Sequence, residues 1–210
     1  SAQPRLGDGR SRAVRAALPH IHLIACNGLA TLEQLKALKE AGVNSYNHNL
    51  ESSKNHYAKI CTTHSWEERY QTCLHVKESG LYLCSGGIFG LGESREDRTS
   101  FIESIKELSP ATMPLNFYHH NPSLPLKADP LSEEEALEII KEVRAALPQT
   151  MLMVAGGREI TFNNRQCDIF AAGADAIVIG DYLTTKGQAP VEDLEMIRNL
   201  GYEIAKECHT

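Results

Sequence analysis

Short apolar runs alternate with longer amphipathic stretches along the chain. The apolar runs predict strands near residues 21–26, 43–48, 81–85, 112–117, 151–155 and 176–180. The amphipathic stretches predict helices near residues 31–41, 65–79, 95–108, 132–147, 162–172 and 190–207. Strands and helices that alternate through short connections indicate a parallel sheet, because each crossover must return the chain to the same edge. We therefore expect an α/β fold, namely a partial TIM-type (βα)8 barrel with about six strand-helix units.

Capping residues mark several of these helix boundaries. Ser65 and Ser132 each precede acidic residues, so a hydroxyl cap and a negative first turn stand where the helix dipole favours them. Gly42, Gly80 and Gly173 follow predicted helices, at positions where a left-handed residue is commonly needed. These signals support the predicted starts and stops.

The predicted units fall about two short of a closed barrel. An eight-stranded barrel usually takes roughly 250 residues, and this chain has 210. Residues 1–12 do not supply the difference, because they are polar, rich in Gly and Arg and without periodicity, which predicts a disordered tail or an artefact. Residues 13–18 are typical of the end of a helix, so we expect residues 13–210 to form one partial barrel that begins mid-barrel.

Composition narrows the possible partners and the compartment. The chain is 42% hydrophobic, which is sufficient for a real core. Its net charge of -6 argues against nucleic acid as a partner. No apolar run approaches the roughly 20 residues that a membrane helix needs, so we expect a cytoplasmic protein. The six cysteines are scattered, which favours reduced thiols or metal ligands over a disulfide framework.

The second predicted strand ends in an unusual run of polar residues. Alternate residues of a strand share a face, so Asn47, Asn49 and Glu51 are expected to point to the same side. Three such groups in an apolar sheet would cost about 1 to 3 kcal/mol each unless a ligand or a network satisfied them. A single Asn at a strand end is more often a cap. Three polar side chains in alternation favour a polar pocket instead.

Other chemically distinctive residues also fall at predicted strand ends. Cys26 ends the first strand, Cys84 the third, Asn116 the fourth and Arg158 the fifth. In a parallel barrel the chemistry lies at the carboxyl ends of the strands, so these residues are candidates for one site. For each cysteine alone, simple packing in the core is the more common role.

Three motifs, in this order, resemble the biotin synthase family of radical SAM enzymes. They are Tyr-Asn-His-Asn-Leu at residues 46–50, Cys-Ser-Gly-Gly-Ile at 84–88 and Gly-Gly-Arg-Glu at 156–159, and the resemblance runs from about Ala13 to the C-terminus. It implies sulfur insertion into dethiobiotin to form biotin. In that reaction an electron reduces a 4Fe-4S cluster, S-adenosyl-L-methionine (SAM) is cleaved, and the resulting radical abstracts hydrogen from dethiobiotin. The resemblance also implies an electron donor such as flavodoxin or ferredoxin, and a homodimer.

The same resemblance implies roles for individual residues. Three of the four ligands of a sulfur-donating 2Fe-2S cluster match Cys26, Cys84 and Arg158. The implied substrate and SAM contacts are Asn47, Asn49, Glu51, Arg69, Ile88 and Asn116. Among these, Glu51 would accept hydrogen bonds from the SAM ribose, and Arg69 would pair with the SAM carboxylate.

The cluster motif of radical SAM enzymes is missing from this sequence. A 4Fe-4S cluster of that type needs Cys-x3-Cys-x2-Cys, whereas the nearest cysteines here, Cys73 and Cys84, stand 11 positions apart. The chain therefore supplies no 4Fe-4S ligands and resembles the C-terminal portion of such an enzyme, which leaves turnover by this chain alone open. Two alternatives remain, a clusterless binding or assembly module and a phosphate-binding barrel enzyme, the latter suggested by the last predicted strand.

Overall fold

The protein is built on one parallel sheet. The structure is a computed structural model and describes residues 8–120, 125–182 and 186–205. The sheet has the order β1-β2-β3-β5-β6-β7, with β4 also paired to β5, and every pairing is parallel. The strands are β1 (Ile24–Ala25), β2 (Ser45–Asn47), β3 (Tyr82–Cys84), β4 (Gly87–Phe89), β5 (Thr112–Phe117), β6 (Met151–Val154) and β7 (Ala176–Ile177). The α/β prediction is confirmed.

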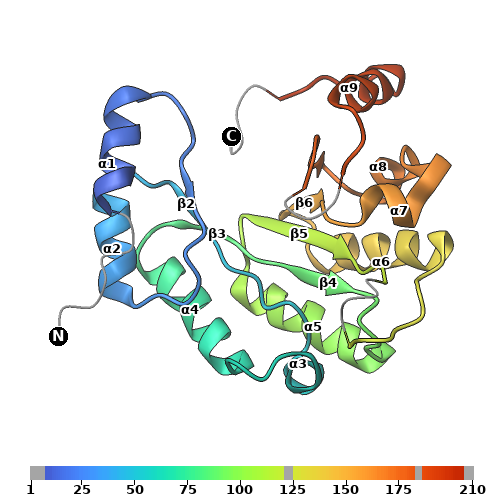
Figure 1. The fold of residues 1–210 in the computed structure, drawn as a ribbon, viewed down its shortest axis with the longest axis horizontal. Helices are drawn as coiled ribbons and strands as arrows, with labels where there is room; N and C mark the ends of the chain where they lie inside the picture. Colours follow the sequence, from blue (N-terminus) through green and yellow to red (C-terminus); the bar gives the residue numbers. More distant parts are fainter. Residues whose placement is uncertain (1–7, 121–124, 183–185, 206–210) are drawn as a thin grey trace.

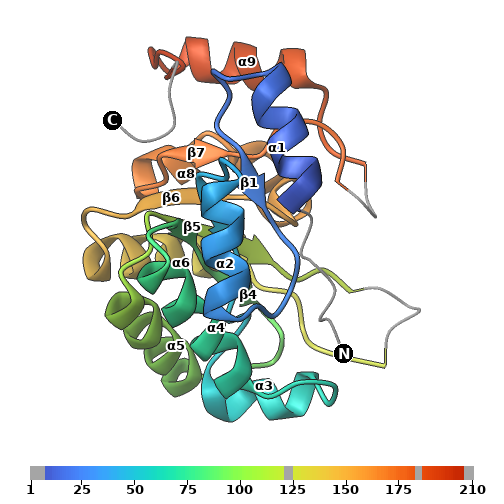
Figure 2. The ribbon, with the colours of Figure 1, turned by 90° about the vertical axis from the view of Figure 1, so that its left-hand side faces the viewer.

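Helices follow the strands in an arc around the outside of the sheet (Figure 1). They are α1 (Asp8–Ala17), α2 (Leu32–Glu40), α3 (Lys54–Ile60), α4 (Trp66–Glu78), α5 (Arg95–Leu108), α6 (Glu133–Ala146), α7 (Arg158–Phe162), the 3-10 helix η1 (Asn163–Arg165), α8 (Asp168–Ala172) and α9 (Pro190–Asn199). Helix α2 packs against α4, α5 against α6, and α6 against α8. From the side, α2, α4 and α5 follow one another on the same face of the molecule (Figure 2).

Side chains along the strands alternate between the two faces of the sheet. Leu83, Met113 and Leu152 are buried against the helices and belong to the main core. Burial on the opposite face differs from strand to strand: Ile24 and Tyr82 are 57% and 53% exposed, whereas Ser45, Cys84 and Thr112 are buried. In the described part of the chain β1 and β7 are the end strands, so the sheet is open, as expected for a partial barrel.

The structure differs from the predicted elements in four places. Helix α3 and strand β4 were not predicted. Ser53 starts α3 by accepting a hydrogen bond from the His56 backbone N–H. The helix predicted over 162–172 is divided into α7, η1 and α8, because Asn163 has a φ of 41°. The last helix ends at Asn199 rather than near 207, and Gly201 with a φ of 78° turns the chain away.

The N-terminal segment also differs from its prediction. Residues 8–12 were predicted as part of a disordered tail, but they belong to helix α1, so that prediction was wrong for them; residues 1–7 lie outside the described residues. Further along the same helix, the Arg15 guanidinium donates to the backbone oxygens of Gly42 (2.8 Å), Pro19 (2.8 Å) and Ile21 (2.8 Å). These bonds fasten α1 to the start of the barrel.

Candidate active site

The strand register brings the two candidate cysteines level with each other. Ala25 pairs with Tyr46, and Asn47 pairs with Cys84, so Cys26, Asn47 and Cys84 follow in one row across three strands. Residues in register on parallel strands share a face, so this row lies on the face of the sheet opposite to Leu83. Cys26 is exposed and Cys84 is buried. Burial, with a smaller effect of Cys26, raises the pKa of the Cys84 thiol to about 11.

A close backbone contact joins the segment after β2 to Gly86, between β3 and β4, and to Gly87, the first residue of β4. The backbone N–H groups of Leu50 (3.0 Å) and Glu51 (3.2 Å) both donate to the Gly86 oxygen, and the Ile88 N–H donates to the Glu51 oxygen at 2.9 Å. A Cβ on Gly87 would stand 2.4 Å from the Glu51 carbonyl oxygen, so only glycine permits this approach. Glu51 itself adopts a φ of 69°. Residues 50–51 and residues 86–88 are therefore joined through their backbones.

Arg69 and Glu51 form the polar centre of this joined region. Arg69 Nε donates to the Asn49 backbone oxygen at 2.7 Å, and Arg69 Nη2 donates to Glu51 Oε1 at 3.2 Å. The second carboxylate oxygen, Glu51 Oε2, is buried and accepts no hydrogen bond from the described residues. Burial raises the pKa of Glu51, while Arg69 and the Asn49 side chain oppose the shift. A buried acceptor without a donor is costly unless a ligand supplies one.

The candidate amides are partly occupied by backbone contacts. Asn49 Oδ1 accepts from the Gly86 N–H at 3.1 Å. Asn116 donates through Nδ2 to the Gly87 oxygen at 3.1 Å and accepts through Oδ1 from the Gly156 N–H at 2.9 Å. Both side chains thus fix the loops at the strand ends.

Arg158 lies at the carboxyl end of β6, in a cage of side chains. It is fully buried, and its Nη2 donates to Asp193 Oδ2 at 2.8 Å, while Nη1 donates to Gln166 Oε1. Glu159 Oε1 also accepts from Nη2, at 3.0 Å. Of the three candidate cluster ligands, Cys26 and Cys84 are aligned by the strand register. The Arg158 side chain is bonded instead to Asp193, Gln166 and Glu159. Asp193 and Gln166 were missed because no sequence motif marks them.

His48 stands between Asn47 and Asn49 in the sequence. Its side chain is buried, and its Nε2 has no hydrogen-bond partner among the described residues. Burial, assisted by the Arg69 cation, lowers its pKa to about 4. Because the folded state favours neutral His48, this stabilisation is complete above the unfolded pKa of 6.5 and is lost as the pH falls toward 4. Over that interval the loss is up to about 3 kcal/mol.

We therefore expect His48→Asn to reduce the acid sensitivity of folding. In urea titrations at pH 7 and pH 4.5, the wild type should lose more unfolding free energy between the two pH values than the variant. His20→Asn, which alters an exposed histidine, is the control and should behave as the wild type. Equal losses in the wild type and the His48 variant would contradict the burial argument.

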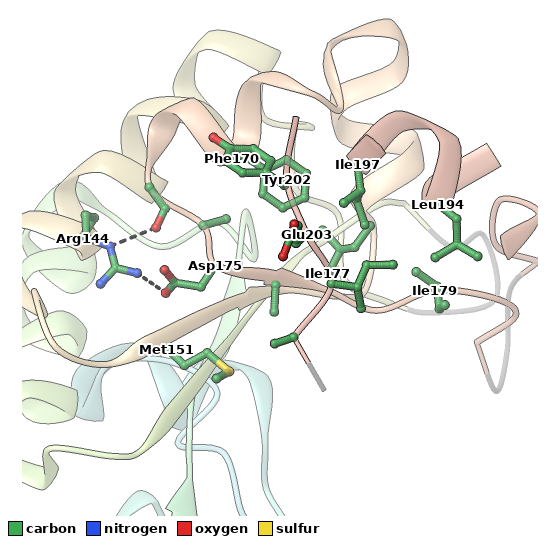
Figure 3. Close-up of a pocket in the computed structure, with 15 residues that line it drawn as sticks. Arg144, Met151, Phe170, Asp175, Ile177, Ile179, Leu194, Ile197, Tyr202 and Glu203 are labelled. Carbon is green, nitrogen blue, oxygen red and sulfur yellow. Dashed lines mark hydrogen bonds and ion pairs between the residues drawn. The ribbon is translucent and has the colours of Figure 1, made fainter. Parts of the chain in front are cut away.

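A cavity on the described part of the chain is lined by none of these site residues. It has a volume of about 680 Å³ and runs along β7, where Leu194 and Ile197 of α9 face Ile177 and Ile179 (Figure 3). Its lining arginine, Arg144, is paired with Asp175. An apolar lining with a neutralised cation does not favour an anion, so the cavity gives no support to the phosphate-binding alternative. Within the described residues, no group of three or more His, Cys, Asp or Glu side chains could hold a metal ion.

Comparison with known proteins identifies the family. Residues 1–105, which include the predicted tail, match the Radical SAM superfamily, and residues 114–203 match the Biotin and Thiamin Synthesis associated domain. The chain is 54% identical over 197 residues to a biotin synthase of Aliarcobacter butzleri, covering 94% of this chain and 70% of the relative. It is 55% identical over 199 residues to a biotin synthase of Campylobacter jejuni, covering 95% and 72%. The chain belongs to the biotin synthase family. It therefore has a biotin synthase-like radical SAM enzyme function, as the sequence motifs predicted.

Two solved structures of low sequence identity share the fold. Methylornithine synthase superposes with a TM-score of 0.77 at 15% identity, over 97% of this chain and 64% of the other. The FeFe-hydrogenase maturase HydG of Carboxydothermus hydrogenoformans superposes with a TM-score of 0.74 at 16% identity, over 99% and 55%. At these identities the likeness concerns the fold alone. None of the helices in the described ranges is long and apolar enough to cross a membrane.

Proposed function

We propose that this chain binds SAM and dethiobiotin at the carboxyl edge of its sheet, for the insertion of sulfur that forms biotin. The observation that carries the proposal is the Glu51 carboxylate, which has one oxygen bonded to Arg69 and a second, buried oxygen with no donor among the described residues. A ribose diol supplies the hydroxyl donors that this oxygen lacks. The names of the relatives, all biotin synthases, supply the reaction class.

The residues around Glu51 suit the remainder of SAM. Arg69 is placed beside Glu51 and offers a planar donor group for a carboxylate. Gly86 and Gly87 have no side chains, so SAM can approach the backbone closely there and at the next residue, Ile88. Asn47, Asn49 and Asn116 offer amide groups that can both donate and accept, as a ureido ring requires.

Cys26, Cys84 and Arg158 are the residues of this chain that would hold a 2Fe-2S cluster. Two thiols in register on one face fit such a cluster, and the raised pKa of Cys84 means that binding requires the loss of its proton, so binding should strengthen with pH. When bound, the clusters of this family supply the radical chemistry and the sulfur. We also propose a flavodoxin or ferredoxin as the electron donor, and a homodimer.

Titration of the purified protein with SAM, followed by calorimetry, tests the proposal. Replacing Glu51 with Gln should weaken SAM binding about 10- to 100-fold, because a charge-assisted bond is worth about 1.5 to 3 kcal/mol. Glu78→Gln, which alters an exposed glutamate of α4, should leave binding unchanged. The proposal fails if the Glu51 variant binds as the wild type does, or if folded wild-type protein binds no SAM.

A further inference from the structure

A buried ion pair joins Arg158 to a helix far away in the sequence. Arg158 and Asp193 both have fully buried side chains, and their Nη2 and Oδ2 atoms lie 2.8 Å apart. Asp193 is also the one buried residue of α9 in its described range, Pro190–Asn199. A surface helix is ordinarily held by an apolar stripe. Here the most deeply buried attachment of α9 is a carboxylate.

The backbone at Arg158 is held in place by the tight packing of the preceding residue, Gly157. What remains to be determined is the direction of the Arg158 guanidinium. Gly157 caps the start of α7 with a φ of 82°, and a Cβ there would stand 2.0 Å from the Phe117 carbonyl oxygen. From this fixed origin the guanidinium meets acceptors from three other segments. They are Gln166 after η1, the Val178 backbone oxygen (3.4 Å) after β7, and Asp193 on α9.

Among these acceptors, Asp193 dominates the direction of the guanidinium. The Val178 contact is long, Gln166 is neutral, and the Glu159 side chain is 19% exposed, so water screens it. Asp193 is charged and fully buried, where an ion pair is least screened. Gln166 is in turn held by Gln188, through an Nε2 to Oε1 bond of 2.7 Å. Asp193 is therefore the fully buried acidic partner of Arg158, and Gln166 is a neutral partner that Gln188 holds in place.

We propose that Asp193 is the positioning residue of Arg158, and that α9 delivers this carboxylate to the carboxyl edge of the sheet. In this role Asp193 acts through Arg158, by setting the direction of its guanidinium. The inference deepens the proposed function and rests on it, since Arg158 is there one of the residues that would hold the 2Fe-2S cluster.

The guanidinium signals of Arg158 in protein labelled with 15N-arginine test this positioning directly. An Arg158→Lys sample identifies the signals. In Asp193→Asn we expect exchange of the Arg158 Nη hydrogens with water to rise about tenfold or more, and in Asp193→Glu we expect partial recovery of the protection. Glu192→Gln, which alters the adjacent and exposed acid of α9, is the matched control and should leave exchange unchanged. Unchanged exchange in folded Asp193→Asn overturns the proposal.

A second measurement separates positioning from a merely structural role. After anaerobic reconstitution with iron and sulfide, Asp193→Asn should shift the visible absorption bands of the bound cluster relative to the wild type. In an Arg158→Met background Asp193 has no guanidinium to position, so the double variant Arg158→Met/Asp193→Asn should show the same bands as Arg158→Met alone. Identical bands in the wild type and Asp193→Asn overturn the proposal. If the wild type takes up no iron, the proposed cluster role fails, and the exchange measurement still decides whether Asp193 holds Arg158.

Discussion

Replacing Gly157 with Ala is expected to lower the unfolding free energy by about 4 kcal/mol or more, whereas the same change at Gly80 should cost about 1 to 2 kcal/mol. Both glycines have a positive φ, 82° and 77°, so both variants pay the strain of a left-handed alanine. Only at Gly157 would the new Cβ collide with backbone, at 2.0 Å from the Phe117 oxygen; at Gly80 nothing lies within 4 Å.

Urea unfolding of the two variants measures this difference. Since β5 carries the contacted carbonyl, relief of the clash at Gly157 must displace either β5 or the start of α7. The Gly157 variant should therefore also disturb Arg158, the next residue, and weaken its bond to Asp193. Equal costs at the two glycines would show that the chain relaxes around the added methyl group, and that the tight seat of α7 on β5 is not a constraint.

Local signals in the sequence predicted most of the fold. Hydrophobic periodicity predicted the six strand-helix units, and Ser65 and Ser132 do cap α4 and α6 by accepting hydrogen bonds from the backbone N–H groups of Glu68 and Glu135. Gly42 and Gly173 have positive φ values of 91° and 118°, as predicted for residues that end helices. These features depend on neighbours within a few residues, which is why they can be predicted from one sequence.

The rest of the site depends on contacts between distant segments. Strand β4 exists because the glycines at 86 and 87 let the backbone pair with both Glu51 and β5, and no local propensity predicts that. The pairing of Arg158 with Asp193 spans 35 positions of the sequence. Asp193 stands beside Glu192 in the first turn of α9, where the helix dipole favours acidic residues, so nothing local marks it as a partner of Arg158.

The two ends of the sheet lead to the prediction with the largest effect on the behaviour of this polypeptide. In the described part of the chain, β1 and β7 each have a strand on one side only. Ile24 of β1 is 57% exposed, and Ile179, just after β7, is 44% exposed. Apolar open edges are templates for pairing with another chain, and closure of a barrel removes them. We expect the 210-residue polypeptide to form oligomers or aggregates through these edges.

Size-exclusion chromatography and a thermal melt at micromolar concentration measure this association. Ile24→Lys places a charge on the β1 edge, which blocks strand pairing, and should shift the protein toward monomer. Ile160→Lys changes an isoleucine of α7 that is similarly exposed, at 53%, and should leave association as in the wild type. A sharp, cooperative monomer for the wild type would contradict the argument, because it would mean that the sheet satisfies its own edges. An equal effect of both lysines would point to general solubility rather than to strand pairing at β1.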